Sequence, residues 1–199
     1  METTNKTADT NGKTEKSGAK RAHPFKHFRV ITKHRHTVLR HCLRAGIPLR
    51  GLLHDLSKYS PTEFLPSARF FDGSRSPTEL ERAAHGFSKA WVHHKGRNRH
   101  HFEYWTDYHP ETKAIVPVKM PLKFVLEMFC DRVAASKVYK GRDYNDACPY
   151  EYFINGRAKK RMHEETAALL EKLLLMLRDE GEKKTFAYIR KEVRGKKDY

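Results

Sequence analysis

Residues 51–64 read GLLHDLSKYSPTEF, a leucine-rich stretch interrupted by three polar residues. With Pro48 as a natural first residue, the pattern predicts a helix from about Pro48 to Tyr59. At 100° per residue, the polar side chains and the leucines lie on opposite sides of that helix. The polar side holds His54, Asp55 and Lys58, and the apolar side holds Leu49, Leu52, Leu53 and Leu56.

The polar side is either a face in contact with solvent or one wall of a metal site. Taken alone it favours the solvated face, because the leucines would pack the core. Gly51 lies on the polar side, where its missing side chain would let an ion or its ligand approach the backbone. The end of the stretch predicts a new helix, with Ser60 as N-cap, Pro61 at the first helical position and Glu63 at the third. We assign no chemistry to this capped start.

The remaining sequence predicts an all-α fold in a single domain over residues 23–199. Residues 1–22 are polar and basic, which predicts a disordered tail. The core of the domain is expected at about residues 25–140, followed by C-terminal helices over about 157–193. Further helices are predicted at about residues 24–45, 77–94, 122–139, 157–179 and 183–193, another is expected to begin at Asn98, and one short strand at about 114–118.

Composition limits the classes of protein that fit this chain. Its 199 residues carry a formal net charge of +16, which predicts attraction to polyanions such as nucleotides or nucleic acid. No apolar run reaches the ~18 residues of a membrane-spanning helix, and we expect no membrane partner. The polar N-terminus and three widely spaced cysteines fit a cytoplasmic protein with reduced thiols. The sequence does not indicate the oligomeric state.

Histidine is unusually frequent, with 13 residues, four of them between His93 and His101. His34 fills a gap in the apolar stripe of the first helix, and Asp131 lies in line with apolar residues of the helix over 122–139. His27, His34 and His41 share one helix face at intervals of seven, and we choose His34 as the inward one. By the same alignment we prefer His94 to His93. Each of these residues alone is more typical of a hydrogen-bonded core or a solvated surface.

The order of these residues resembles the HD-domain superfamily of metal-dependent phosphohydrolases. That superfamily is named for a His-Asp doublet, here His54-Asp55, and its members are all-α. The resemblance implies an HD-domain-like helical bundle that holds a divalent metal. The mixture of histidine and carboxylate ligands favours Fe or Mn, with Zn, Mg or Co as alternatives. The resemblance also implies that Lys58 contacts a phosphate or a bridging ligand. The implied metal ligands are His34, His54, Asp55, Asp131 and, for a second metal, His94, His100 and His101.

A closer resemblance is to a small bacterial and phage family of unknown function. It rests on GLLHDLSKYSPTEF, on AWVHHKGRNRHHFEYW at residues 90–105, and on the segment from Met120 to Asp131. It covers about residues 25–140. The cyclic-dinucleotide branch of the HD superfamily has a Gly-Tyr-Pro motif after its His-His pair, where this chain has Phe-Glu-Tyr-Trp. That substrate is therefore not expected here.

These patterns together predict a metal-dependent hydrolase that acts on a phosphorylated small molecule or nucleotide. Asp55 and Lys58 are the expected catalytic residues, since Lys58 would neutralise charge that develops on phosphorus. Lys95, Arg97 and Arg99 would attract an anionic substrate, or would simply be solvated. Two alternatives remain: a di-iron oxygenase that uses the same ligands, and a non-enzymatic helical protein that binds nucleic acid through its basic surface.

Overall fold

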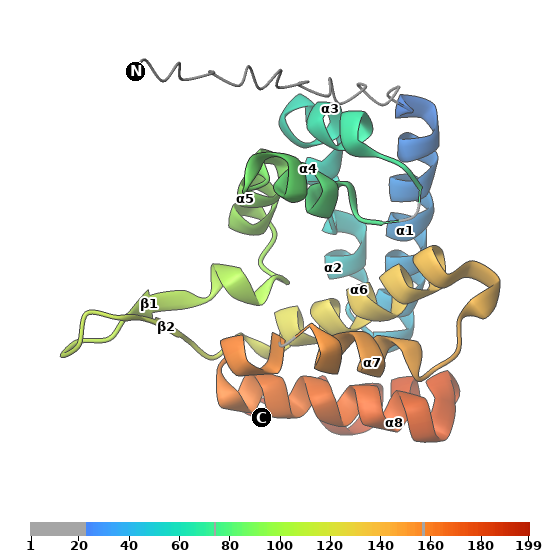
Figure 1. Cartoon of the computed structure of the whole chain (residues 1–199). Coiled ribbons are helices and arrows are strands. Elements are labelled where there is room, and N and C mark those ends of the chain that lie inside the picture. Colours follow the sequence, from blue (N-terminus) through green and yellow to red (C-terminus); the bar gives the residue numbers. More distant parts are fainter. Residues whose placement is uncertain (1–22, 74, 157) are drawn as a thin grey trace, which may run out of the picture.

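The computed structural model describes residues 23–73, 75–156 and 158–199, and it is all-α, as the sequence predicts. The predicted tail over residues 1–22 lies outside the described residues. Figure 1 shows the helices and the one small hairpin. The principal helices are α1 (Pro24–Ala45), α2 (Pro48–Leu53), α3 (Pro61–Phe70), α4 (Pro77–His85), α5 (Lys89–Arg97), α6 (Leu122–Lys140), α7 (Cys148–Asn155) and α8 (Glu164–Tyr188).

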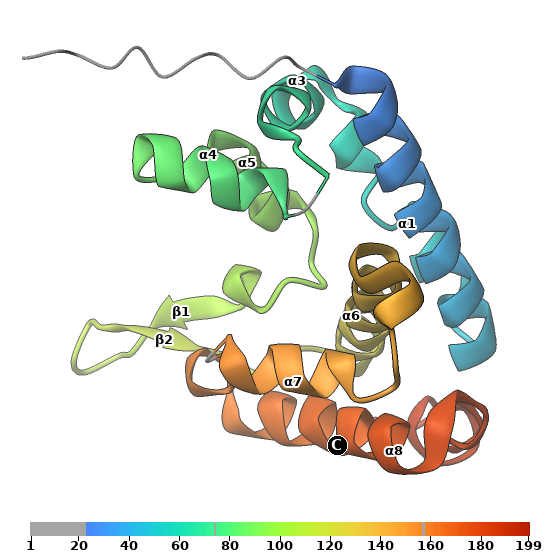
Figure 2. The ribbon, with the colours of Figure 1, turned by 45° about the vertical axis from the view of Figure 1, so that its right-hand side comes forward.

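Helix α6 forms the centre of the hydrophobic core. Its sequence is apolar nearly all round, and Val125, Phe129 and Val133 are fully buried. It packs against α1 on one side and α8 on another (Figure 2). Because α6 has buried faces on both sides, a charged residue on it needs partners within the protein. Glu127 and Asp131 both lie on this helix.

The predicted helix from Pro48 to Tyr59 is wrong, because the chain breaks at the His-Asp doublet. Helix α2 ends at Leu53, and a short 3-10 helix, η1 (Leu56–Tyr59), follows. Asp55 lies between them with φ of 52°, in the left-handed region that Asp tolerates better than most residues. The break turns His54 and Asp55 inward together, whereas one continuous helix would have separated their side chains by about 100°.

The predicted packing of the leucines is also wrong. The side that α2 buries is the one with Gly51, and a Cβ there would lie 2.6 Å from Cys42 Cβ of α1. Gly51 therefore allows two helices to approach each other and makes no room for an ion. With Gly51 turned inward, the leucines face outward and are 45–65% exposed: Leu49, Leu52, Leu53 and Leu56.

Other predicted boundaries hold only in part. Helix α3 begins at Pro61 as predicted, but Ser60 makes no side-chain capping bond. The predicted helix over 77–94 is two helices, because Gly86 ends α4 with φ of 77° and the Ser88 hydroxyl caps α5. The predicted helix at Asn98 is instead a turn followed by a 3-10 segment, η2 (Phe102–Tyr104). The predicted helix over 157–179 begins only at Glu164. A kink at Gly181, inside α8, separates it from the predicted helix over 183–193, which comprises the end of α8 and the π-helical η5 (Ile189–Val193).

The remaining elements connect these helices. β1 (Thr106–Tyr108) and β2 (Ile115–Pro117) pair antiparallel, with Thr106 opposite Pro117. This hairpin contains the predicted strand region and projects to one side of the molecule (Figure 1). Two 3-10 segments, η3 (Gly141–Asp143) and η4 (Ala158–Arg161), flank α7.

Candidate metal centre

Seven residues from five parts of the chain converge in the interior between α1, α5 and α6. His34 comes from α1, the doublet His54-Asp55 from the break after α2, and Asp131 from α6. Their ligand atoms all lie within 4.8 Å of one another. A second group meets the same criterion and shares Asp55 with the first: Asp55, His94, His100 and His101. All seven residues that the sequence suggests as metal ligands are thus brought together.

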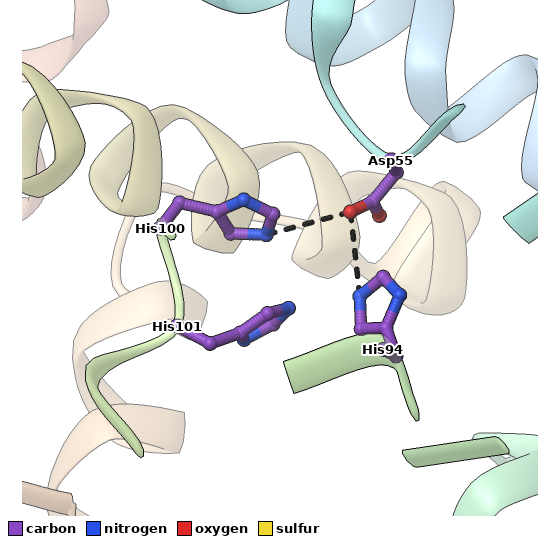
Figure 3. Close-up of side chains that lie close together, drawn as sticks. All are labelled: Asp55, His94, His100 and His101. Atoms are coloured by element: carbon purple, nitrogen blue, oxygen red, sulfur yellow. Dashed lines mark ion pairs between the residues drawn. The ribbon is translucent and has the colours of Figure 1, made fainter. Parts of the chain in front are cut away.

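Asp55 lies at the junction of the two groups. Its Oδ1 is 3.3 Å from His94 Nε2 and 3.5 Å from His100 Nε2, as Figure 3 shows. Its Oδ2 is 3.3 Å from His54 Nε2 and 2.7 Å from Lys58 Nζ. Each carboxylate oxygen therefore faces a different histidine group, which is the arrangement that a bridging carboxylate needs.

Asp131 closes the first group from the opposite side. Its Oδ1 is 3.0 Å from His34 Nε2 and 3.6 Å from His54 Nε2, and its Oδ2 is 3.8 Å from His100 Nε2. The predicted burial of Asp131 holds in part, because 18% of its side chain is exposed. This opening leaves one edge of the cluster accessible.

The inward-facing atoms of the cluster are buried yet lack hydrogen-bond partners among the described residues. Asp55 Oδ2 forms an ion pair with the Lys58 ammonium at 2.7 Å, but the close contacts between the histidine nitrogens and the carboxylate oxygens of Asp55 are not hydrogen bonds. Buried polar groups are normally satisfied, so each unsatisfied atom calls for an explanation. The atoms are His34 Nε2, His54 Nε2, His100 Nε2, His101 Nε2 and both carboxylate oxygens of Asp55.

A glutamate on α6 contacts two of the histidines on the ring nitrogens that face away from the cluster. Glu127 is fully buried, and its Oε1 is 3.0 Å from His54 Nδ1 and 3.3 Å from His100 Nδ1. Its Oε2 accepts from Arg50 Nε at 2.7 Å. A hydrogen on each Nδ1 directed at this carboxylate leaves the Nε2 lone pairs facing the cluster, as metal-binding histidines require.

Glu63 of α3 does the same for His94. Its Oε2 is 2.7 Å from His94 Nδ1, and its Oε1 is 2.7 Å from His93 Nδ1. His93 Nε2 accepts from Arg97, so both ring nitrogens of His93 have partners outside the cluster. His94 is therefore the inward histidine. The sequence patterns do not indicate that either glutamate supports a histidine, and they predict only a helix-capping role for Glu63.

His27 and His41 lie away from the cluster. His27 packs between the rings of Phe64 and Phe71, and burial, with a smaller effect of Lys58, lowers its pKa to about 4. His41 stacks on Phe186, and burial lowers its pKa to about 4, partly opposed by Glu182. Of the three histidines at intervals of seven, His34 is the one that reaches the doublet.

The electrostatics of the cluster favour a positive charge at its centre. Burial opposes ionisation, but His54, Lys58 and His94 hold the pKa of Asp55 well below its usual value. Burial also opposes ionisation of Asp131, yet His34 and His54 lower its pKa. The pKa of His54 is raised despite its burial, chiefly by Asp55. The ionised carboxylates of Asp55 and Asp131 therefore stabilise positive charge on the groups between them, and Lys58 beside Asp55 supplies one such charge.

A small cavity of about 100 Å³ lies beside the cluster. Lys58, His94 and His101 line it together with hydroxyl groups from several elements, among them Ser67, Thr78 and Tyr139. Among its described lining residues, Lys58 is the only lysine or arginine. Lys95, Arg97 and Arg99, which the sequence suggests as an anion funnel, do not line this cavity, and Arg99 lies over the Tyr104 ring.

Residues 23–176 match the model of a family of unknown function, DUF5662. The chain belongs to this family. The matched part contains every residue of the cluster and both supporting glutamates. Comparison with curated proteins and with solved structures gives no match. In the described part of this DUF5662 member, no helix is long and apolar enough to cross a membrane.

Proposed function

We propose that the cluster binds divalent metal ions, and the unsatisfied inward-facing atoms carry this proposal. Four imidazole Nε2 atoms and the two Asp55 carboxylate oxygens face one another without hydrogen-bond partners, and of these atoms Asp55 Oδ2 forms an ion pair with Lys58 Nζ at 2.7 Å. Acceptors placed against acceptors in a buried site repel each other unless a cation lies between them. The carboxylates behind the histidines support the same assignment, because they direct the Nε2 lone pairs inward.

The donor set fits a divalent transition metal. Imidazole nitrogens mixed with carboxylate oxygens suit Fe, Mn or Zn, while an all-oxygen site would suit Mg or Ca. We favour Fe or Mn, with Zn, Mg or Co as alternatives. The first group would hold one ion through His34, His54, Asp55 and Asp131. The second would hold another through His94, His100, His101 and the shared Asp55.

We further propose that this site hydrolyses a phosphate ester or a nucleotide-type substrate, as an HD-domain-like phosphohydrolase would. A divalent metal would supply Lewis acidity toward phosphoryl oxygens and a water of lowered pKa. Lys58 Nζ lies beside Asp55 at the cavity and keeps its positive charge, because Asp55 and Asp131 raise its pKa despite burial. It would bind a phosphoryl oxygen and stabilise negative charge in the transition state.

The cavity supports a small phosphorylated group in this position. Its volume of about 100 Å³ suits a phosphoryl group with the rest of the substrate outside. The hydroxyls of Ser67, Thr78 and Tyr139 line it and would donate hydrogen bonds to phosphate oxygens. The partially exposed edge at Asp131 would leave the site open to solvent water.

The proposal is tested by metal-dependent hydrolysis with purified protein. Chelator-treated protein reconstituted with Mn²⁺ or Fe²⁺ should release phosphate from phosphomonoesters, phosphodiesters or nucleotides. Asp55→Ala should abolish release, whereas Asp179→Ala should retain it, because Asp179 pairs with Arg178 on the surface. If no reconstituted metal gives release from any of these substrates, the hydrolase assignment fails. Oxygen consumption without phosphate release would instead favour a di-iron oxygenase at the same site.

A further inference from the structure

A second and larger cavity is lined by residues of α3, α4 and α5 and shares no lining residue with the cavity at the metal centre. Its volume is about 670 Å³, within the usual range for small-molecule sites. None of its lining residues belongs to the proposed metal ligands or to the supporting glutamates. The lining consists of Leu65, Pro66, Arg69, Phe70, Glu81, His85, Phe87 and Lys89.

The charges at this cavity are not balanced. Within the described part of the chain, the Arg69 guanidinium and the Lys89 ammonium have no ion-pair or hydrogen-bond partner, and both residues are exposed. Glu81 is the only acid in the lining, and it is buried. Its Oε2 accepts from the Ser88 hydroxyl and its Oε1 from the Lys89 backbone N–H at 3.2 Å. The carboxylate is therefore occupied, and two free cations remain for an anion.

The walls of the cavity are aromatic and aliphatic. The Phe70 and His85 rings pack edge to face, with centroids 5.5 Å apart. Phe87 is 52% exposed and Leu65 is 64% exposed. An exposed apolar surface next to unpaired cations suits a ligand that has a flat apolar part and a negative charge.

We propose that the cavity between α3, α4 and α5 binds a nucleoside monophosphate, a small ligand that has an aromatic base and a phosphate. The base would lie against Phe87 and the Phe70–His85 pair, and Arg69 and Lys89 would bind the phosphate. The cavity at the metal centre, at about 100 Å³, is too small to enclose a nucleoside, so the two cavities select different groups. This inference does not depend on catalysis at the metal centre.

The experiment is a calorimetric titration of chelator-treated, full-length protein with adenosine monophosphate. About 0.15 M salt limits non-specific attraction to the +16 chain. Arg69→Ala should weaken binding by about tenfold or more, because it removes charge-assisted hydrogen bonds to the phosphate. Phe87→Ala should also weaken binding, and both side chains are exposed, so the variants should fold.

The matched control is Arg190→Ala, which removes the same charge from an exposed position in η5. It should leave affinity unchanged. Unchanged binding in Arg69→Ala, or an equal loss in Arg190→Ala, would overturn the proposal. Inorganic phosphate should bind more weakly than adenosine monophosphate, and equal affinity would refute the aromatic contribution. Lys58→Ala should retain binding; its loss would place the nucleotide at the metal centre instead.

Discussion

Glu127→Gln tests whether the Glu127 carboxylate orients His54 and His100 for metal binding. The carboxylate accepts from His54 and His100 through Oε1 and from Arg50 through Oε2. Glutamine has the same shape but only one acceptor oxygen. If that oxygen faces the histidines, the amide NH₂ faces the Arg50 donor. If the amide is reversed, NH₂ faces both Nδ1 atoms, which then accept, and the ring hydrogens move to Nε2 where the metal would bind.

Either orientation should weaken metal binding with little change in shape. Removing one supporting partner of a metal ligand typically costs 10–100-fold in affinity. Because Glu127 supports two histidines, we expect a loss near the upper end, about 100-fold or roughly 2.7 kcal/mol. The assay is a competition titration of Mn²⁺ or Zn²⁺ against a chromophoric chelator, with thermal unfolding measured on the same samples.

Glu182→Gln is the matched control for this variant. Like Glu127, Glu182 is a carboxylate close to a histidine and an arginine, His41 and Arg44, but it is only partly buried and lies outside the cluster. Its replacement should lower stability and leave metal affinity unchanged. The reasoning is refuted if folded Glu127→Gln binds metal as tightly as the wild type, or if Glu182→Gln weakens binding as much.

Three further predictions follow from single residues. His27 has a pKa of about 4 when folded and 6.5 when unfolded, so its contribution to stability is complete above pH 6.5 and is lost as pH falls toward 4. The wild-type free energy of unfolding should fall between pH 6.5 and pH 4, and His27→Phe should make this fall smaller by up to about 3 kcal/mol, as measured by urea denaturation. An unchanged pH dependence in His27→Phe would contradict this. Gly51→Ala should lower the melting temperature by several degrees, because its Cβ would lie 2.6 Å from Cys42 Cβ. A melting temperature equal to that of the wild type would show that α1 and α2 can move apart without loss of stability. Lys58→Met should retain metal in the chelator titration but reduce phosphate release at least about tenfold; full activity would remove Lys58 from the proposed mechanism.

Much of the candidate site could be predicted from the sequence because its ligands interrupt recognisable patterns. His34 replaces an apolar residue in a helical stripe, and Asp131 does the same in the most apolar helix. Such exceptions mark positions where a polar group must find a partner inside. The doublet was harder to place, because helical periodicity does not reveal that Asp55 adopts a left-handed conformation and ends the helix. A continuous helix would bury the leucines, whereas the leucines are exposed.

The partners of the two supporting carboxylates could not be predicted, for a different reason. Glu127 lies within the apolar α6, but its partners His54 and His100 are distant in sequence and only the fold brings them together. Glu63 matched a helix-capping pattern, which local spacing explains without any reference to His94. An acidic residue among apolar neighbours on a helix indicates a buried carboxylate that needs a partner. Glu127 shows this pattern, as Asp131 does.

The central claim is that the buried histidine and aspartate cluster binds divalent metal. The most direct measurement is the metal content of protein purified without chelator and, separately, reconstituted anaerobically with Fe²⁺, Mn²⁺ or Zn²⁺, determined by elemental mass spectrometry. We predict bound metal in the wild type and in Glu182→Gln, and its loss in folded Asp55→Ala. A wild-type protein that retains no metal under any of these conditions would contradict the account.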